Sequence, residues 1–378
     1  PTARNSMASR GKITIFGIGR LGLCTALCLD RAGYDVLGVD VFPSYVKAIN
    51  ERTFTSTEPR VVEFLKEAKN FRATTDCDEG INHADLILIF VATPSTGGDR
   101  HYDHTMLGKV LMDINARKVQ NKHVVIGCTV IPGYIASTGR YLLRDCVNTS
   151  LSYNPEFIAQ GDIMRGTLAP DMVLIGEGSP EAGEILADHY RHMCENSPSI
   201  HRMSPESAEI CKLSVNCFVT MKVSFANMIG DIADATPGAD KNHILAAVGA
   251  DTRVGTKYLR PGYGYGGPCF PRDNRALGGY ATQIGVSPLL PIATDAYNKL
   301  HTQRQIETLL ATGEKQFTFT GIGYKDPCPV PIIEESQKLV VAAGLAKAGC
   351  QVTVRDKDYL IRAVQLEYGD AFTYEIDA

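Results

Sequence analysis

A glycine-rich turn between a strand pattern and a helix pattern limits the fold of this chain more than any other feature. Residues 12–16 alternate and are rich in β-branched side chains, which predicts a strand. The sequence Gly-Ile-Gly-Arg-Leu-Gly follows at 17–22, and residues 23–32 have a helical pattern. A second strand is predicted at 35–39 and ends in Asp40. This order of strand, glycine turn, helix, strand and acid is typical of a dinucleotide-binding Rossmann unit.

Each residue of this motif has a physical task. Gly17 allows the tight turn, Gly19 lets a pyrophosphate approach the backbone, and Gly22 lets the helix pack closely on the strand. The helix N-terminus offers free N–H groups and a positive dipole end to the phosphates. Asp40 lies 18 residues past Gly22, where a carboxylate binds a ribose 2′-hydroxyl and repels a 2′-phosphate. Because no Arg follows it directly, we expect NAD rather than NADP.

The alternation of strands and helices continues along the chain. Apolar runs at 84–91 and 123–127 predict two buried strands, and 151–157 is a candidate for another. Ligands of open α/β sheets bind at the carboxyl ends of the strands. Three side chains fall at these strand ends: Thr93, Thr129 and Glu156. They are therefore candidates for a ligand site.

The length and composition exclude several classes of protein. A chain of 378 residues suggests two or three domains. Its composition, 44% hydrophobic and 21% charged, is that of an ordinary soluble globular protein, and its formal net charge is −4. Because no basic block occurs, nucleic acid and anionic membranes are poor partner candidates. No apolar run reaches about 18 residues, so no membrane span is predicted.

The eleven cysteines are scattered, and none forms a Cys-x-x-Cys pair. An odd, dispersed set argues against a disulfide framework and favours a reducing, cytoplasmic location. Cys24 and Cys28 share a helix face, but no nearby His or Cys would complete a metal site, so we interpret them as small buried residues and predict no metal. Residues 1–6 precede Met7 and are interpreted as a cloning remnant, so the fold prediction leaves them out. No signal-peptide pattern is found.

A long helix is predicted from Pro205 to about Ala235, with Ser204 as its cap. At about 30 residues it would be about 45 Å long. It is apolar on nearly all sides, which predicts burial between domains or between subunits. Lys212 and Asn216 lie one turn apart on this helix. A buried Lys is costly without a partner, which favours a functional pair over a snorkelling Lys beside a solvent-facing Asn.

The segment 262–273 places Cys269 in a glycine-rich turn with a proline on each side. Glycines allow a ligand to approach the backbone, and the prolines fix φ around the cysteine. The cation of Arg272 would favour the reactive thiolate. Asp273 is a candidate general base, an orienting group for Lys212, or a surface carboxylate. A free cysteine is usually structural, but this setting favours a nucleophile. With the dinucleotide motif, it suggests thiol-assisted oxidation of an aldehyde by a nicotinamide cofactor.

These motifs, in this order, resemble the UDP-glucose/GDP-mannose dehydrogenase family. The matching pieces span residues 12 to about 300 and are GIGRLG, VATP, CTVIPG, NPEFIAQG, PDMVLIG, AEICKLSVN, SFANMI, GADTRVG and GYGGPCFPRD. The resemblance implies a four-electron oxidation in which the primary alcohol of a nucleotide sugar becomes a carboxylate and two NAD are consumed. Cys269 matches the family's nucleophile, which would form a thiohemiacetal and then a thioester that water hydrolyses.

The resemblance also implies roles for other site residues. Lys212 and Asn216 match the pair that steadies the oxyanion. Glu156 matches the acid that activates the hydrolytic water, and Thr129 and Asp273 match residues that position the water and the alcohol. The implied cofactor contacts are Gly17, Gly19, Gly22, Asp40, Thr93 and Thr129. The implied substrate contacts are Phe157, Lys212, Arg253, Tyr258, Gly266 and Lys325. Arg253 matches an arginine that enters the neighbouring subunit's site, which implies a homodimer or larger oligomer with the long helix at its interface.

The chain departs from the family pattern at several positions. Gln160 stands where many relatives have Glu, Met172 where Arg is usual, and Met228 where Glu is usual. Residues 317–325 resemble the start of the family's nucleotide-binding C-terminal domain, but Glu334 reverses the charge of the usual Arg. A helix at about 334–348 and one strand at 351–354 are predicted to complete a shortened domain.

We therefore expect an α/β protein with an N-terminal Rossmann domain, a helical middle domain built on a long central helix, and a shortened Rossmann-like C-terminal domain. The expected boundaries are 8–200, 204–300 and 312–378. Three functions remain open: a UDP-glucose-like nucleotide-sugar 6-dehydrogenase, a related NAD-dependent dehydrogenase with a different or smaller nucleotide-linked substrate, and a catalytically silent NAD-binding relative. The intact set of Cys269, Lys212, Asn216, Glu156 and Asp273 argues against the third.

Overall fold

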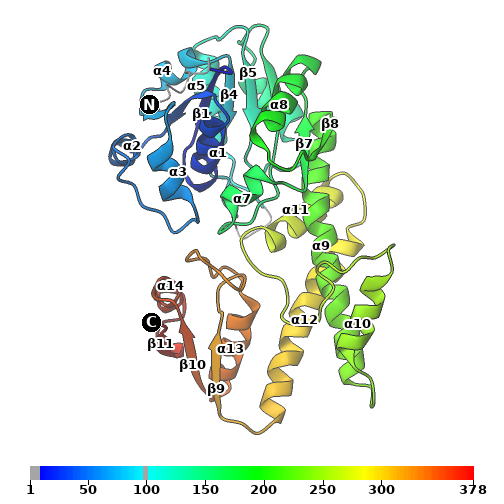
Figure 1. Ribbon diagram of the computed structural model, residues 1–378. Helices are drawn as coiled ribbons and strands as arrows, with labels where there is room; N and C mark the ends of the chain where they lie inside the picture. The colour runs from blue at the N-terminus through cyan, green and yellow to red at the C-terminus, as the bar shows by residue number, and fades with distance from the viewer. Residues whose placement is uncertain (1–8, 97–100) are drawn as a thin grey trace. The chain divides into compact units, whose positions relative to one another are not determined.

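The computed structural model describes residues 9–96 and 101–378 (Figure 1). The proposed remnant at 1–6 lies outside the described residues. The chain divides into two compact units. Among the described residues, unit 1 contains 9–96 and 102–212, and unit 2 contains His101 and 213–378.

Unit 1 is built on an eight-stranded sheet with the order β3-β2-β1-β4-β5-β6-β7-β8. The strands are β1 (Lys12–Phe16), β2 (Asp35–Val39), β3 (Phe71–Thr74), β4 (Leu86–Ile89), β5 (His123–Ile126), β6 (Ser150–Tyr153), β7 (Met172–Gly176) and β8 (Ser199–Met203). All neighbouring pairs are parallel except β6 and β7. The chain order reverses between β1 and β4, so their carboxyl ends meet at the switch point where such sheets bind ligands.

The helices of unit 1 cover both faces of this sheet. They are α1 (Arg20–Arg31), α2 (Pro43–Asn50), α3 (Val61–Glu67), α4 (Cys77–His83), α5 (Thr105–Ala116), η1 (Ile135–Gly139), α6 (Arg140–Leu142), α7 (Ile163–Leu168) and α8 (Pro180–Met193). In β4, Leu86 and Leu88 join the core that contains α1, whereas Ile87 and Ile89 join the core that contains α5. Burial on both faces explains why this strand is a continuous apolar run in the sequence.

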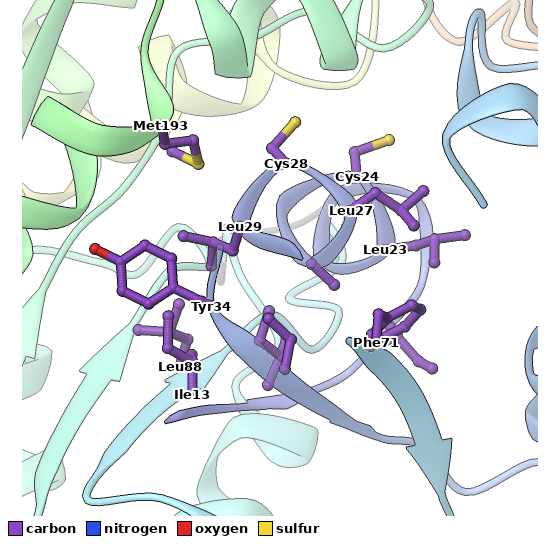
Figure 2. Packing of buried hydrophobic residues seen from close by; sticks show 14 of the residues in the cluster. Ile13, Leu23, Cys24, Leu27, Cys28, Leu29, Tyr34, Phe71, Leu88 and Met193 are labelled. Atoms are coloured by element: carbon purple, nitrogen blue, oxygen red, sulfur yellow. The ribbon is translucent and has the colours of Figure 1, made fainter. Parts of the chain in front are cut away.

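The predicted strands agree closely with the observed ones. β1 and β2 have the predicted bounds, while β4 is shorter than the apolar run at 84–91. β6 ends at Tyr153 and is shorter than the candidate strand at 151–157, so Glu156 lies past the strand end. Figure 2 shows the sulfurs of Cys24 and Cys28 on the side of α1 away from the strands, and both side chains are buried and unbridged.

Helix α9 (Pro205–Asp234) has 30 residues and matches the predicted long helix. Its first turn is capped by Ser204, whose Oγ accepts from Ser207 N at 3.1 Å. The sequence predicted that α9 is buried between domains or between subunits, and within the single chain one stripe of it is exposed. Phe218, Phe225 and Ile232 are 60%, 44% and 55% exposed. The helix has apolar residues all round, but its neighbours within the chain leave one stripe uncovered.

Among the described residues, unit 2 contains the rest of α9, five further α-helices and a small parallel sheet with the order β11-β10-β9. Its elements are α10 (Lys241–Ala250), α11 (Phe270–Gln283), α12 (Leu289–Ala311), β9 (Gln316–Thr320), α13 (Gln337–Lys347), β10 (Gln351–Asp356), α14 (Asp358–Tyr368), η2 (Gly369–Ala371) and β11 (Thr373–Ile376). No helix among the described residues is both long and apolar enough to cross a membrane.

The C-terminal region contains more structure than the sequence predicted. The prediction ended with one helix and one strand, but α14 and β11 follow β10. α13 also begins later than the predicted start at 334, because Glu335 has a positive φ of 49° and cannot lie within a helix. Leu360 and Val364 of α14 are buried against Val352 and Val354 of β10, which explains why this amphipathic segment folds.

Candidate active site

The glycine turn after β1 has the geometry that a pyrophosphate requires. Gly17 has a φ of 87°, and a Cβ placed on it would lie 2.7 Å from the carbonyl oxygen of Phe90. A Cβ on Gly22 would lie 1.8 Å from the carbonyl oxygen of Gly17. By contrast, a Cβ on Gly19 would meet nothing within 4 Å. Gly17 and Gly22 are therefore required by packing, and Gly19 keeps the backbone open to a ligand.

The start of α1 and the end of β2 complete a dinucleotide site. Gly19 caps α1 without a side-chain hydrogen bond, and the first turn contains no acid, so its N–H groups suit a phosphate. Asp40 Oδ2 accepts from Ile18 N at 3.2 Å, which fixes the carboxylate beside the glycine turn. Val41 and Phe42 are exposed next to it. The donor set and the open backbone fit NAD.

Thr129 follows β5 in a loop that is fastened at several points. Val130 N donates to Tyr153 Oη at 3.4 Å, and Ile131 N donates to His104 Nε2 at 3.3 Å. Burial lowers the pKa of His104, which keeps its ring neutral and able to accept. Thr93, after β4, is buried. Both threonines thus lie past carboxyl ends of parallel strands, as predicted.

Lys212 is buried, and its ammonium has two partners within unit 1. Nζ donates to the carbonyl oxygen of Glu156 at 2.5 Å and lies 4.5 Å from the ring centre of Phe157. The Glu156 carboxylate accepts from Ile158 N. These contacts offset part of the cost of burying a charge. The structure therefore brings together three of the predicted site residues.

A second group of predicted residues meets in unit 2 at the start of α11. Asp273 is fully buried, and its Oδ2 accepts from Asn216 Nδ2 at 2.6 Å. Its Oδ1 lies 3.3 Å from Arg272 Nε. Cys269 is the N-cap residue of α11, is half-buried, and accepts through its carbonyl from Asp273 N at 2.8 Å. Cys269 thus lies at the positive end of this 14-residue helix.

The other predicted substrate residues, Tyr258, Arg253, Gly266 and Lys325, each contact a different neighbour in unit 2. Tyr258 is exposed with a φ of 60°, and its ring meets Phe270 edge-on at 6.0 Å. Arg253 is exposed and paired with Asp251 at 2.8 Å. A Cβ on Gly266 would lie 2.1 Å from the carbonyl oxygen of Glu335, and Lys325 Nζ lies 5.7 Å from the Tyr324 ring.

Comparisons with known proteins agree with this geometry. Residues 11–194 match the NAD binding domain of the UDP-glucose/GDP-mannose dehydrogenase family, and residues 206–299 match its central domain. The GDP-mannose 6-dehydrogenase of Pseudomonas syringae pv. tomato is 31% identical over 350 residues, which cover 87% of this chain and 78% of that protein. The chain belongs to the UDP-glucose/GDP-mannose dehydrogenase family.

Further relatives support the assignment. The UDP-glucose 6-dehydrogenase of Haloferax volcanii is 27% identical over 95% of this chain and 87% of its own length. The solved structure of a UDP-glucose dehydrogenase from Pyrobaculum islandicum has a TM-score of 0.87 and 26% identity, covering 100% of this chain and 88% of that chain. This member of the family is an NAD-dependent dehydrogenase, and the glycine turn of unit 1 is where NAD fits.

Two buried acids of this dehydrogenase were not found from the sequence. Glu58 accepts from Gly161 N at 2.8 Å and from Ile163 N at 2.8 Å, and so fastens the segment after Phe157. Glu209, on α9, accepts from Ile135 N at 3.4 Å beyond the Thr129 loop. Neither has a local sequence signal, because each acts on backbone that is distant in the chain.

Proposed function

We propose that this dehydrogenase oxidises the primary alcohol of a nucleotide sugar, UDP-glucose-like, to the uronate in two successive steps. The observation that carries the proposal is Cys269 at the N-terminus of α11, next to the buried Asp273–Asn216 pair. Bound NAD would accept one hydride in each oxidation. The names of the relatives support a nucleotide sugar as substrate.

The cysteine allows the second oxidation. After the alcohol has lost a hydride and a proton, the Cys269 sulfur adds to the aldehyde carbon, and the thiol proton passes to the aldehyde oxygen. Loss of the second hydride and of the hydroxyl proton leaves a thioester. Water then attacks the carbonyl carbon, the C–S bond breaks, and the thiol and a carboxylate are released. A free aldehyde lacks this route because its trigonal carbonyl carbon bears no hydroxyl oxygen that could re-form a C=O bond as the hydride leaves.

The neighbouring residues would support these steps. Lys212 and Asn216, four residues apart on α9, are suited to stabilise the developing oxyanion, at about 3–4 kcal/mol for one well-placed donor. Glu156 and Thr129 would position and activate the hydrolytic water. Asp273 would hold Asn216 and take part in positioning the alcohol, since the two side chains are hydrogen-bonded. We assign Gly17, Gly19, Gly22, Asp40, Thr93 and Thr129 to the cofactor.

The substrate contacts and domains follow the same assignment. Phe157, Tyr258, Gly266 and Lys325 would contact the nucleotide sugar, together with Lys212. The domains would be an NAD-binding domain at 8–200, a middle domain at 204–300 and a nucleotide-sugar domain at 312–378.

We expect a cytoplasmic enzyme, since the cysteines are unbridged. Arg253, exposed on one chain, would reach the site of a second subunit in a homodimer or larger oligomer.

The stoichiometry of NADH formation tests the function. The purified protein is mixed with NAD and, in separate reactions, UDP-glucose, GDP-mannose and their N-acetylated analogues. Two NADH per sugar consumed would support the proposal, and the nucleotide that gives the higher kcat/KM would identify the base. One NADH per sugar would indicate a simple alcohol dehydrogenase instead.

A Cys269→Ser variant tests the covalent role. It should lose the second oxidation, so that any product is an aldehyde and kcat for carboxylate falls by about 100-fold or more. Cys211→Ser serves as the matched control, because Cys211 is also half-buried but has no role in the proposal. Carboxylate formation by Cys269→Ser at the wild-type rate would refute the thioester mechanism.

A further inference from the structure

The backbone that leads to Cys269 is held by buried side chains from α9 and α12. Asn227 Oδ1 accepts from Gly262 N at 3.0 Å. Asn298 accepts from Tyr265 N at 2.9 Å and donates to Tyr265 O at 3.0 Å. His301 Nε2 lies 2.6 Å from the carbonyl oxygen of Gly262. Three side chains, each at most 6% exposed, thus fasten a segment that has no regular secondary structure of its own.

The contacts of His301 fix the orientation of its ring. Its Nδ1 lies 2.9 Å and 3.0 Å from the two carboxylate oxygens of Asp231, and its Nε2 faces the Gly262 carbonyl. A carbonyl oxygen only accepts, so Nε2 is the donor in that contact. Tyr297 Oη donates to Asp231 at 2.8 Å, and Arg304 Nε lies 3.8 Å from the same carboxylate. These partners hold the Asp231 carboxylate beside the ring.

A neighbouring side chain shares the Gly262 carbonyl with His301. Gln305 Nε2 also reaches this oxygen, at 3.2 Å, so it accepts twice. Asp231 and His301 are 8% and 6% exposed, which makes them a buried pair rather than a surface one. Removing one partner of such a pair is costly, because the other polar group is left buried without it. Both ring nitrogens of His301 thus have a defined partner, which packing of a core histidine does not require.

We propose that His301, paired with Asp231, is a positioning residue that sets the place of Cys269 through Gly262. The inference rests on the proposed role of Cys269. Beyond Tyr265, Gly266 packs against the Glu335 carbonyl, and Gly267 N donates to Glu334 O at 2.7 Å. The segment is thus fixed at successive residues up to the cysteine. Loss of the His301 anchor would shift the thiol, and a displacement of about 1 Å costs about 100-fold in rate.

Two substitutions at His301 separate anchoring from packing. His301→Leu fills a similar volume but has no donor, whereas His301→Gln keeps one N–H that can reach the Gly262 carbonyl. We expect hydrogen exchange of the 262–265 amides to be about tenfold faster or more in the Leu variant, with most of the protection restored in the Gln variant. kcat should follow the same order, while KM for NAD stays unchanged. If packing alone mattered, Leu would equal or exceed Gln.

Asp231→Asn removes the carboxylate that orients the His301 ring, and it guards against a Leu variant that does not fold. Protection of the 262–265 amides in this variant should lie between that of the wild type and that of His301→Leu, because His301 keeps its Nε2 donor but loses the carboxylate beside Nδ1. His189→Gln is the matched control, because His189 is also a buried imidazole but belongs to unit 1. This variant should leave the exchange rates of the 262–265 amides unchanged.

The readouts also separate this inference from the proposed function. Hydrogen exchange is measured without substrate, so it tests the anchor even if no nucleotide sugar is oxidised. Wild-type protection in folded His301→Leu and Asp231→Asn proteins would overturn the inference, and so would a Leu variant at least as active and protected as the Gln variant. Loss of protection without loss of kcat would also overturn it, since the anchor would then not position the thiol.

Discussion

At the scale of single residues, neighbouring glycines have different physical tasks that the sequence motif alone does not rank. Gly22 is required because a Cβ would collide with the Gly17 carbonyl at 1.8 Å, whereas a Cβ on Gly19 would meet nothing within 4 Å. Packing therefore constrains Gly22, and ligand access constrains Gly19. The two positions can be tested against each other.

Substituting these glycines by Ala should separate folding from cofactor binding. Gly22→Ala should destabilise unit 1 by about 1–3 kcal/mol, because α1 must move away from the turn. Gly19→Ala should change stability by less than about 0.5 kcal/mol but weaken NAD binding about tenfold or more, because its methyl group would occupy the phosphate approach. Thermal unfolding and NAD titration calorimetry give the two quantities. Equal stability of both variants would contradict the packing argument.

Glu209 is a second residue whose environment produces a measurable effect. Its side chain is fully buried, and Oε1 has no hydrogen-bond partner among the described residues. Burial raises the pKa of this carboxyl to about 7. Because the folded pKa is above the unfolded one, stability from the protonated form is fully present below the ordinary Glu pKa and is lost as the pH rises through about 7.

Glu209→Gln should remove this loss. The neutral amide should match the wild type near pH 5 and exceed it by about 1–3 kcal/mol in free energy of unfolding at pH 8. Urea unfolding at several pH values gives the difference directly. Glu63→Gln, a surface carboxyl on α3, is the control and should show no such trend. Wild-type and Glu209→Gln curves that run parallel from pH 5 to pH 8 would show that the carboxyl is not perturbed.

At the scale of elements, α9 carries candidate site residues on one face and exposed apolar side chains on another. One face carries Lys212 and Asn216 with their buried partners, and another leaves Phe218, Phe225 and Ile232 exposed. A row of large exposed apolar side chains at a seven-residue spacing is typical of a helix that packs against another protein surface. This agrees with the homodimer that we propose.

Charging this stripe should dissociate the oligomer. Phe225→Glu would place a carboxylate in an apolar contact and should weaken self-association by about 100-fold or more, without unfolding the chain. Leu366→Glu is the matched control, because Leu366 is 91% exposed on α14 and lies outside the stripe. Sedimentation of the three proteins measures the effect. A dimer of unchanged strength in Phe225→Glu would place the interface elsewhere.

At the scale of the whole molecule, local patterns predicted most elements and few of their contacts. The strand at 12–16, the strand at 35–39 and the long helix from Pro205 were found because their periods and caps are local. The segment from Asp358 onward was missed, since a short amphipathic helix after a strand has no strong signal until its partner strand is known. The apolar composition of α9 predicted burial between domains or subunits, but it did not show which sides the chain itself covers.

The sequence by itself determined the Rossmann unit, the choice of NAD and the candidate nucleophile, because each depends on residues within a short stretch of chain. Only the tertiary structure decided that Asn216 holds Asp273, that Glu209 meets Ile135, and that His301 anchors Gly262. The members of each pair lie far apart in sequence and become neighbours only when helices pack. A buried polar group must find a partner wherever packing places it, and no local rule specifies that partner.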